Sequence, residues 1–299
     1  MEQQITELFC GVDDFSKQYA AYAQAHGLPG QSGLHCPKSA MALSELMTIV
    51  IWFHLSNHRT FKWYYKNHVS TALRPYFPRQ LSYNRVVELM PSLIAPLTLY
   101  LIHHALGKCS GISFVDSTTL VVCHPRRIHS HKVFDGIAKR GKSSTGWFYG
   151  FKLHLVINDC GEIVSFALTP GNVSDSNRKT MTHLTTNLFG KLFGDKGYLS
   201  QELFEELFHK GITLFTKLRK NMKNKLIPLE DKLLLRKRAV IESVNDFLKN
   251  ICQIEHSRHR SPLNFLANLV SGLIAYSFLP KKPSLHLHDL HSFPALPCS

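Results

Sequence analysis

The sequence predicts an α+β protein in which an all-helical domain, residues 1–107, precedes a mixed sheet flanked by helices, residues 108–280, and a tail, residues 281–299. In the first part apolar residues recur at three- and four-residue spacing, and no strand-like run interrupts them. After Gly107 the pattern switches to runs rich in β-branched and aromatic residues, which is typical of strands. A chain of 299 residues can hold one large domain and a smaller one.

The helical part contains two long apolar stretches, LSELMTIVIWFHLS and YNRVVELMPSLIAPLTLYLIHHAL. Ser44 and Ser82 stand where helices begin, and Pro91 marks a kink or an end. Between the two stretches, basic and aromatic side chains interleave, which suits a DNA backbone. For any single residue here, a place in the core or on a solvated face is the more ordinary explanation. The residues are Arg59, Lys62, Lys66, Arg74, Arg79 and Arg85, with Trp63, Tyr64, Tyr65, Tyr76 and Tyr83.

The second part reads as three strands followed by alternating helices and strands. GISFVDSTTLVVC is the first strand, and FYGFKLHLVINDCGEIVSFALTPG holds two more around a turn at Asp159, Cys160 and Gly161. Asp175 opens a helical segment, LFGDKGY contains a fourth strand, SQELFEELFHKG is a helix and ITLFTKLR a fifth strand. A single long helix, LEDKLLLRKRAVIESVNDFLKNICQ, comes last. The order βββαβαβα is that of the ribonuclease H-like fold.

Three acidic residues stand out by their positions in these elements. Asp116 lies in the middle of the first strand, Asp195 at the end of the fourth and Glu242 on the last helix. A buried carboxylate needs a partner, so Asp116 is a satisfied structural acid, a loop residue or a cation ligand. Taken singly, Asp195 is explained as a turn residue and Glu242 as a surface residue of a helix. In this fold, however, the first and fourth strands are neighbours and the last helix crosses them, so the three acids are expected to converge.

Converging carboxylates repel one another unless cations lie between them. Two hard divalent ions would activate a water or a 3′-hydroxyl and stabilise a leaving oxygen, which is phosphoryl transfer. We therefore expect two Mg²⁺ ions on Asp116, Asp195 and Glu242, with Mn²⁺ as a substitute.

A likeness to a known family rests on three short runs: VDST, DKGY with its following helix, and RAVIESVNDFLK. Over residues 107 to 260 the chain resembles the DDE transposases of bacterial insertion sequences. In the last run Arg238 and Lys249 flank Glu242 at the spacing of that family, whereas its usual Tyr is replaced by Leu235. Only 46 residues separate Asp195 from Glu242, so the chain resembles the compact subgroup without an insertion domain.

The resemblance implies an enzyme that binds the terminal inverted repeats of its element, cuts the DNA and transfers the strand. It also implies a homodimer on paired ends and a helical N-terminal domain that binds DNA. The location is expected to be the cytoplasm of a bacterium, at the nucleoid, because acids stand where a secretion signal would be positive.

Several residues, most of them basic, are predicted to contact the DNA. Arg238 and Lys249 would lie on one face of the last helix beside the metals, and Lys196 and Tyr198 beside Asp195. A long basic loop after the first strand would bind the transposon end, and Trp147 would stack on a base or belong to the core. The loop residues are Arg126, Arg127, Lys139, Arg140 and Lys142.

The formal charge of +14 favours a polyanion partner, with a ribosome-like or membrane-surface protein as the alternative. A membrane role is disfavoured because the apolar stretch LANLVSGLIAYSFLP is interrupted and short, which predicts a buried helix. The seven scattered cysteines, which form no CxxC pair, argue against a disulfide framework and a cysteine zinc site. A zinc site on His124, His129 and His131 is also disfavoured, because no partners follow at finger spacing.

Two other functions remain open at this stage. A structure-specific nuclease of the same fold would share the acids without strand transfer. A DNA-binding repressor, or a catalytically inactive relic, would keep the fold without needing them. Asp135, Asp159 and Asp175 are the rival acids, and each lies beside turn or cap residues that explain it.

Overall fold

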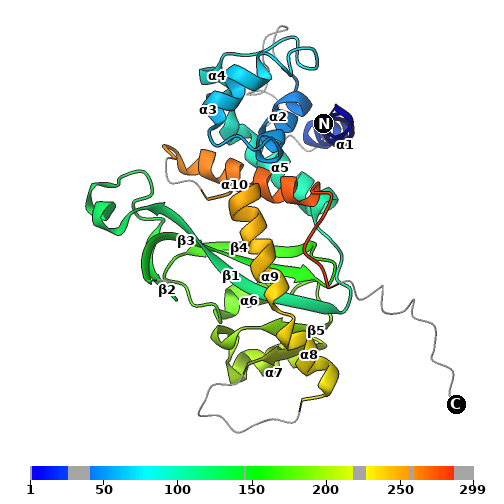
Figure 1. The fold of residues 1–299 in the computed structure, drawn as a ribbon, viewed down its shortest axis with the longest axis vertical. Coiled ribbons are helices and arrows are strands. Elements are labelled where there is room, and N and C mark those ends of the chain that lie inside the picture. The colour runs from blue at the N-terminus through cyan, green and yellow to red at the C-terminus, as the bar shows by residue number, and fades with distance from the viewer. Residues whose placement is uncertain (1, 26–40, 145, 218–226, 256–258, 286–299) are drawn as a thin grey trace, which may run out of the picture. The chain divides into compact units, whose positions relative to one another are not determined.

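The computed structural model describes residues 2–25, 41–144, 146–217, 227–255 and 259–285 (Figure 1). The chain forms two compact units. The first unit comprises residues 1–105, 132–134 and 247–279, and the second comprises residues 106–131, 135–246 and 280–299.

The first unit is helical in its described residues, as the sequence predicted. Ser82 accepts a hydrogen bond from the Arg85 amide at 3.3 Å and so caps a helix, as predicted. At the start of α2 the capping group is Glu45, not Ser44, and it accepts from the Ala42 amide at 2.6 Å. The elements are α1 (Glu2–Ala25), α2 (Leu43–Leu55), α3 (Phe61–Trp63), η1 (Tyr64–Val69), α4 (Tyr83–Leu89), η2 (Met90–Leu93), α5 (Ile94–Tyr100), η3 (Leu101–Ala105), η6 (Phe247–Ile251) and α10 (Pro262–Ser277).

Helix α10 belongs to this unit, which differs from the predicted division at residue 280. Its apolar side chains are buried nearly all round, including Leu269, Leu273 and Ile274. A helix with no polar face must be covered by other elements, and α2 and α5 pack against it. The stretch LANLVSGLIAYSFLP therefore forms a buried helix, as predicted. It belongs to the core of the first unit and not to that of the second.

A second apolar run, Tyr83–Ala105, has the length and a mean hydropathy of 1.5 that would suit a bilayer span. It combines α4, η2, α5 and η3, and Pro91 and Pro96 lie within it. Val86, Leu93 and Leu97 are fully buried in the helical core, and the same length and composition occur in core helices of soluble proteins.

The second unit is built on one mixed sheet. Strand β1 (Ile112–Cys123) pairs antiparallel with β3 (Gly146–Asn158) on one side and parallel with β5 (Gly190–Gly194) on the other. Beyond these, β4 (Ile163–Pro170) pairs antiparallel with β3, and β6 (Ile212–Thr216) pairs parallel with β5. The resulting order β4-β3-β1-β5-β6 is the ribonuclease H-like topology that the element order predicted. The predicted turn joins β3 to β4, with Gly161 at φ +75°.

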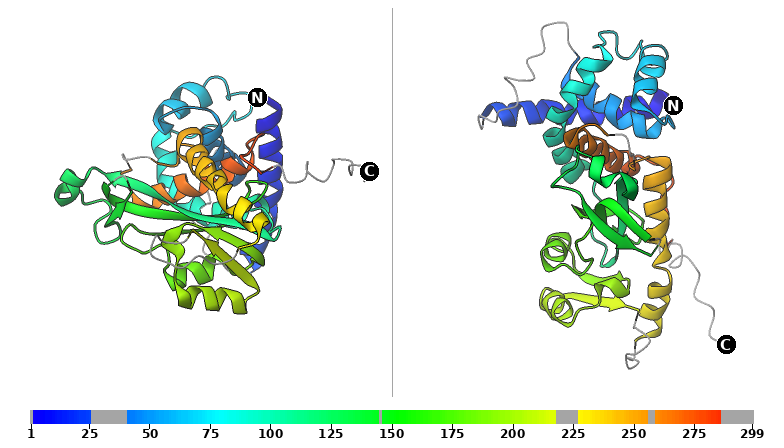
Figure 2. Two further views of the ribbon diagram at one scale, coloured as in Figure 1. Left: turned by 60° about the horizontal axis from the view of Figure 1, so that its bottom comes forward. Right: turned by 90° about the vertical axis from the view of Figure 1, so that its left-hand side faces the viewer.

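Helices cover both faces of this sheet, as the right-hand view of Figure 2 shows. On one face, α6 (Arg178–Leu184) and α7 (Gln201–His209) bury a core that contains Val115, Leu192 and Leu214. Because side chains alternate along a strand, the residues next to Val115 and Leu192 in the sequence point to the other face. There Phe114 and Phe193 stack with ring centroids 5.4 Å apart, and α9 (Ala239–Asp246) packs on β1.

Two predicted elements differ from the observed ones. The predicted basic loop contains the 3₁₀ helix η4 (Pro125–Ser130) and a sixth strand, β2 (Lys139–Ser143), which pairs with the first five residues of β3. The predicted single last helix is divided into α8 (Leu229–Arg236), α9 and η6, with turn residues at Lys237 and Arg238. Neither Pro nor Gly marks that division in the sequence.

Candidate active site

The site begins with the register of the two central strands. Phe114 of β1 lies opposite Phe193 of β5, the last pair of this parallel ladder. Asp116 and Asp195 each follow two residues later, and the backbone at Asp195 is still extended (φ −80°, ψ 174°). With a period of two, both carboxylates start from the same face as the stacked phenylalanines. The predicted neighbourhood of Asp116 and Asp195 is thus a consequence of strand pairing.

Helix α9 and the turn before it bring further groups to Asp116. Asn245 donates from Nδ2 to Asp116 Oδ2 at 3.2 Å, and Arg238 Nη1 lies 3.6 Å from Asp116 Oδ1. Arg238 Nη2 also pairs with Glu242 Oε1 at 2.7 Å. The guanidinium of Arg238 therefore lies between the carboxylates of Asp116 and Glu242, and its side chain is only 10% exposed.

The electrostatics of Asp116 are dominated by its burial. The pKa of its carboxyl is raised from 3.8 to about 6, mainly because burial disfavours the charged form and in smaller part because of the charges of Glu242 and Asp195. The Arg238 guanidinium and a backbone hydrogen bond at Ser117 act in the opposite direction but do not outweigh burial. The three predicted acids therefore lie within electrostatic reach of one another.

The donor set suits a hard divalent cation, because all three side chains offer carboxylate oxygens and their mutual repulsion favours a positive charge. Within the described ranges, however, no three His, Cys, Asp or Glu side chains are gathered closely enough to form a metal-holding group. Arg238 provides the positive charge between Asp116 and Glu242 in this arrangement. Glu242 is 58% exposed and reaches toward the arginine.

The opposite face of β1 holds a separate polar network. Ser117 donates to Asp175 Oδ1 at 2.8 Å, and Lys152 pairs with the same oxygen at 3.0 Å. Asp175 therefore has the structural role expected of it, although Asn177, not Asp175, caps α6. Of the other rival acids, Asp159 accepts from Ser110 and Asp135 accepts from the next backbone amide.

Three of the predicted DNA contacts are buried or paired within the protein. Tyr198 is 1% exposed in the core under α6 and α7, so its prediction as a DNA contact is wrong. Lys249 belongs to η6 in the first unit, where it pairs with Glu255 at 3.1 Å. Arg238 lies beside Glu242 as predicted, but its side chain is buried in ion pairs with Asp116 and Glu242, and its contact with DNA stays a prediction.

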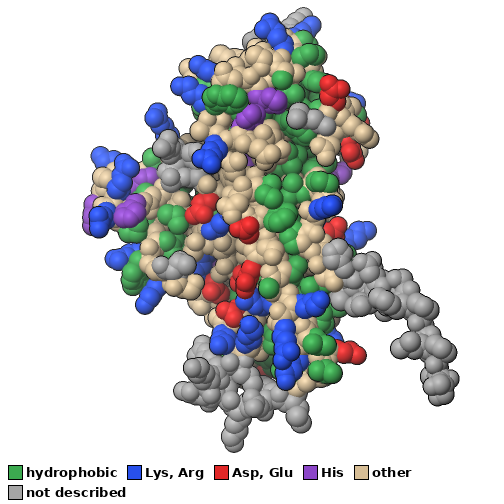
Figure 3. Space-filling view, viewed as in Figure 1, with side chains coloured by type: hydrophobic (Ala, Val, Ile, Leu, Met, Phe, Trp, Pro, Cys, Tyr) green, Lys and Arg blue, Asp and Glu red, His purple; other side chains and the backbone are tan. Residues whose placement is uncertain are grey.

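The remaining predicted contacts are exposed. Lys196 lies on η5 (Lys196–Tyr198), directly after Asp195. The η4 and β2 cations and Trp147 form what we term the basic hairpin, and Figure 3 shows Lys, Arg and His side chains gathered there. Trp147 is 54% exposed, with the Arg140 guanidinium 4.5 Å and the Lys142 ammonium 5.8 Å from its ring centre. A core position for Trp147 is thereby excluded. The cations are Arg126, Arg127, Lys139, Arg140 and Lys142.

Asn245 is the residue of the site that the sequence did not indicate. It stands three positions after Glu242, within the run that carries the family likeness, and its amide gives no signal by type or spacing alone.

The five described cysteines form no disulfide, and two of them, Cys123 and Cys252, are buried.

Residues 106–262 match the family model of the transposase DDE domain. Among solved structures, the chain is similar to a piggyBac transposase synaptic complex with hairpin DNA, at 10% identity and a TM-score of 0.49, over 91% of this chain and 71% of that one. It also matches the structure of a simian T-cell lymphotropic virus intasome in complex with PP2A regulatory subunit B56 gamma, at 15% identity and a TM-score of 0.28, over 70% of this chain and 66% of that one. No curated protein matches the sequence significantly. The match to the family model covers more than half of the chain, which therefore belongs to the transposases with a DDE domain.

Proposed function

We propose that this protein is the transposase of a bacterial insertion sequence, which binds the terminal inverted repeats of its element and catalyses DNA cleavage and strand transfer. The observation that carries the proposal is the placement of Asp116 and Asp195 at equivalent positions of paired parallel strands, under the helix that bears Glu242. Such an arrangement concentrates negative charge at one point on the sheet.

In this proposal Asp116, Asp195 and Glu242 hold two Mg²⁺ ions, or Mn²⁺ in their place. When bound, the ions would supply an activated oxygen nucleophile and stabilise the leaving oxygen of a phosphodiester. Asn245 orients Asp116 through its hydrogen bond of 3.2 Å. Arg238 neutralises part of the acidic charge and holds Glu242 at 2.7 Å, so it is a positioning residue.

The basic hairpin is proposed to hold the DNA. Its five cations make no ion pair with a carboxylate in the parts of the chain that the structure describes, so their charge is available to phosphates. Lys196, exposed beside Asp195, would contact the same strand near the cut. We further propose that two copies of the chain act together on paired ends, in the bacterial cytoplasm.

The test uses purified full-length protein, Mg²⁺ and a plasmid that carries the DNA flanking the coding region. Joined products are expected, whereas cleavage without joining would identify a nuclease, and binding without cleavage a repressor or an inactive relic. Asp116→Asn, Asp195→Asn and Glu242→Gln should each lower the cleavage rate by about a thousandfold or more, because each removes a ligand worth several kcal/mol in the transition state.

Asp135→Asn is the matched control, since this exposed acid accepts from the neighbouring backbone amide among the described residues, away from the three acids, and its loss should leave the rate unchanged. If the three site variants cleaved as fast as this control, the proposed roles of the acids would be wrong.

A further inference from the structure

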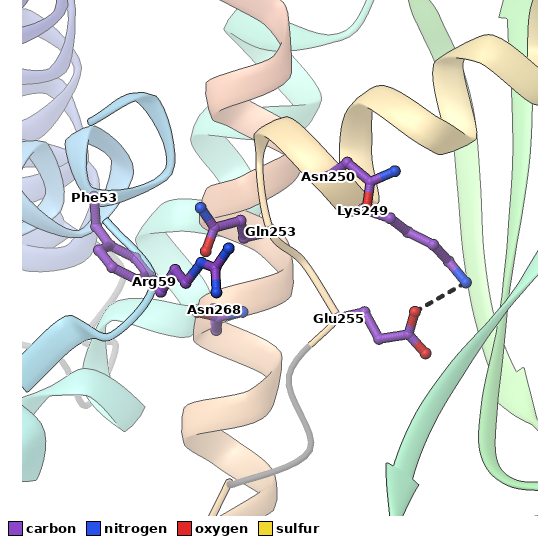
Figure 4. A pocket seen from close by; sticks show the side chains of 7 residues that line it. All are labelled: Phe53, Arg59, Lys249, Asn250, Gln253, Glu255 and Asn268. Atoms are coloured by element: carbon purple, nitrogen blue, oxygen red, sulfur yellow. Dashed lines mark ion pairs between the residues drawn. The ribbon is translucent and has the colours of Figure 1, made fainter. Parts of the chain in front are cut away.

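The first unit contains a polar pocket that the proposed chemistry does not use. Its cavity volume is about 360 Å³, and Figure 4 shows side chains from α2, the following turn, η6 and α10 around it. All of its lining residues belong to the first unit. They are Phe53, Arg59, Lys249, Asn250, Gln253, Glu255 and Asn268.

The charges in the pocket do not cancel. Glu255 provides the one carboxylate of the lining, and Lys249 pairs with it at 3.1 Å. Arg59 is exposed and makes no ion pair with any acid in the described part of the chain. The pocket therefore carries a net positive charge, which comes from the guanidinium of Arg59.

Hydrogen-bond donors gather beside this charge. The Nδ2 group of Asn268 is buried and has no acceptor among the described residues. An unsatisfied buried donor is unfavourable, so an acceptor at this place would be stabilising. In Figure 4 the side chains of Arg59 and Gln253 point toward each other above Asn268.

The backbone at Gln253 supports the same interpretation. Its φ is +50°, a left-handed conformation that is unfavourable for a residue with a side chain. Helices commonly end with a residue in this conformation, and Gln253 comes two positions after η6 ends. Here the conformation lets η6 end while the amide of Gln253 faces the pocket.

We propose that this pocket is an oxyanion site that binds a phosphate group, with Arg59, Asn268 and Gln253 as its donors. A phosphate fits the donors because it accepts several hydrogen bonds and carries the opposite charge. We assign it to the backbone of bound DNA, and this assignment rests on the proposed function. The Lys249–Glu255 pair limits the positive charge of the pocket.

The first experiment titrates the full-length protein with inorganic phosphate at constant ionic strength and measures binding by calorimetry. Arg59→Gln and Asn268→Leu should each weaken phosphate binding by about tenfold or more, since each removes a donor. Glu255→Gln should strengthen it severalfold, because it removes the carboxylate of the lining. Lys62→Gln removes an equal charge from the same unit outside the lining and should leave phosphate binding unchanged. Melting temperatures of all variants verify that they are folded.

The opposite signs of Arg59→Gln and Glu255→Gln separate a binding site from a structural role, which would weaken binding in both. Equal affinities of wild type, Arg59→Gln and Glu255→Gln for phosphate would overturn the proposal. This experiment needs no catalytic activity, and Asp116→Asn should bind phosphate like wild type even if the proposed function is wrong.

The second experiment identifies the source of the phosphate. The affinity for a short DNA duplex is measured by fluorescence anisotropy at several salt concentrations. If the site holds a DNA phosphate, Arg59→Gln should lower the slope of log K against log salt by about one. An unchanged slope, together with weakened binding of inorganic phosphate, would support the oxyanion site and assign it to a free phosphate.

Discussion

Replacing Asp116 by asparagine tests whether the acidic site stores unfavourable energy in the metal-free protein. Asparagine keeps the shape of the side chain and removes its charge. Burial raises the pKa of Asp116 from 3.8 to about 6, so at neutral pH the folded protein holds an ionised carboxylate where the neutral form is preferred. The variant should therefore be more stable than wild type, although it loses activity.

The magnitude follows from the pKa difference. Between 3.8 and about 6 the difference is roughly two pH units, or about 3 kcal/mol of unfolding free energy. The side chain is 21% exposed, and solvent reduces this figure to about 2 kcal/mol. In this pH range the folded state binds more protons than the unfolded state, so wild type loses this stability as pH rises from about 4 to 6. The gain in the variant should be complete above pH 7 and absent below pH 4.

The assay is urea unfolding of both proteins in EDTA at pH 4 and at pH 8. The unfolding free energy of the variant should exceed that of wild type by about 2 kcal/mol at pH 8 and equal it at pH 4. Mg²⁺ at ten times its dissociation constant should then stabilise wild type by about 1.4 kcal/mol and the variant by less. A variant that is less stable than wild type at pH 8 would refute the reasoning, because Asp116 would then be a favourable partner of Arg238.

Three further predictions concern other parts of the molecule. Burial lowers the pKa of His54 from 6.5 to about 4, so about 3 kcal/mol of stability should be lost as pH falls through that range, and His54→Gln should show a smaller loss in urea unfolding. Gly161→Ala should cost about 2 kcal/mol or more, because φ is +75° and a Cβ would lie 1.8 Å from the Pro283 carbonyl oxygen. Gly136→Ala, at φ +78° with open space, should cost only the backbone strain. Trp147→Ala should weaken binding of a DNA duplex by about 1–3 kcal/mol in anisotropy titrations without lowering the melting temperature, whereas unchanged affinity would remove Trp147 from the DNA interface.

Much of the fold could be predicted because its elements depend on neighbouring residues. Apolar spacing predicts the helices, β-branched runs predict β1, β3 and β4, and Gly161 predicts the turn between the last two. The approach of Asp116 to Asp195 also follows, since the element order determines which strands are adjacent. Strand β2 was missed because its Lys, Arg, Gly and Ser residues have no strand pattern of their own and pair only against β3.

Only the tertiary structure decided which side chains face one another. Tyr198 was predicted to contact DNA because it follows Asp195 closely in the sequence. The structure buries it in the core under α6 and α7. The bond from Asn245 to Asp116 joins residues 129 positions apart, and the place of Arg238 between two carboxylates depends on where α8 ends. Local sequence determines the conformation of a segment through interactions over a few residues. The partner and burial of a side chain depend on packing between distant segments, which no local pattern encodes.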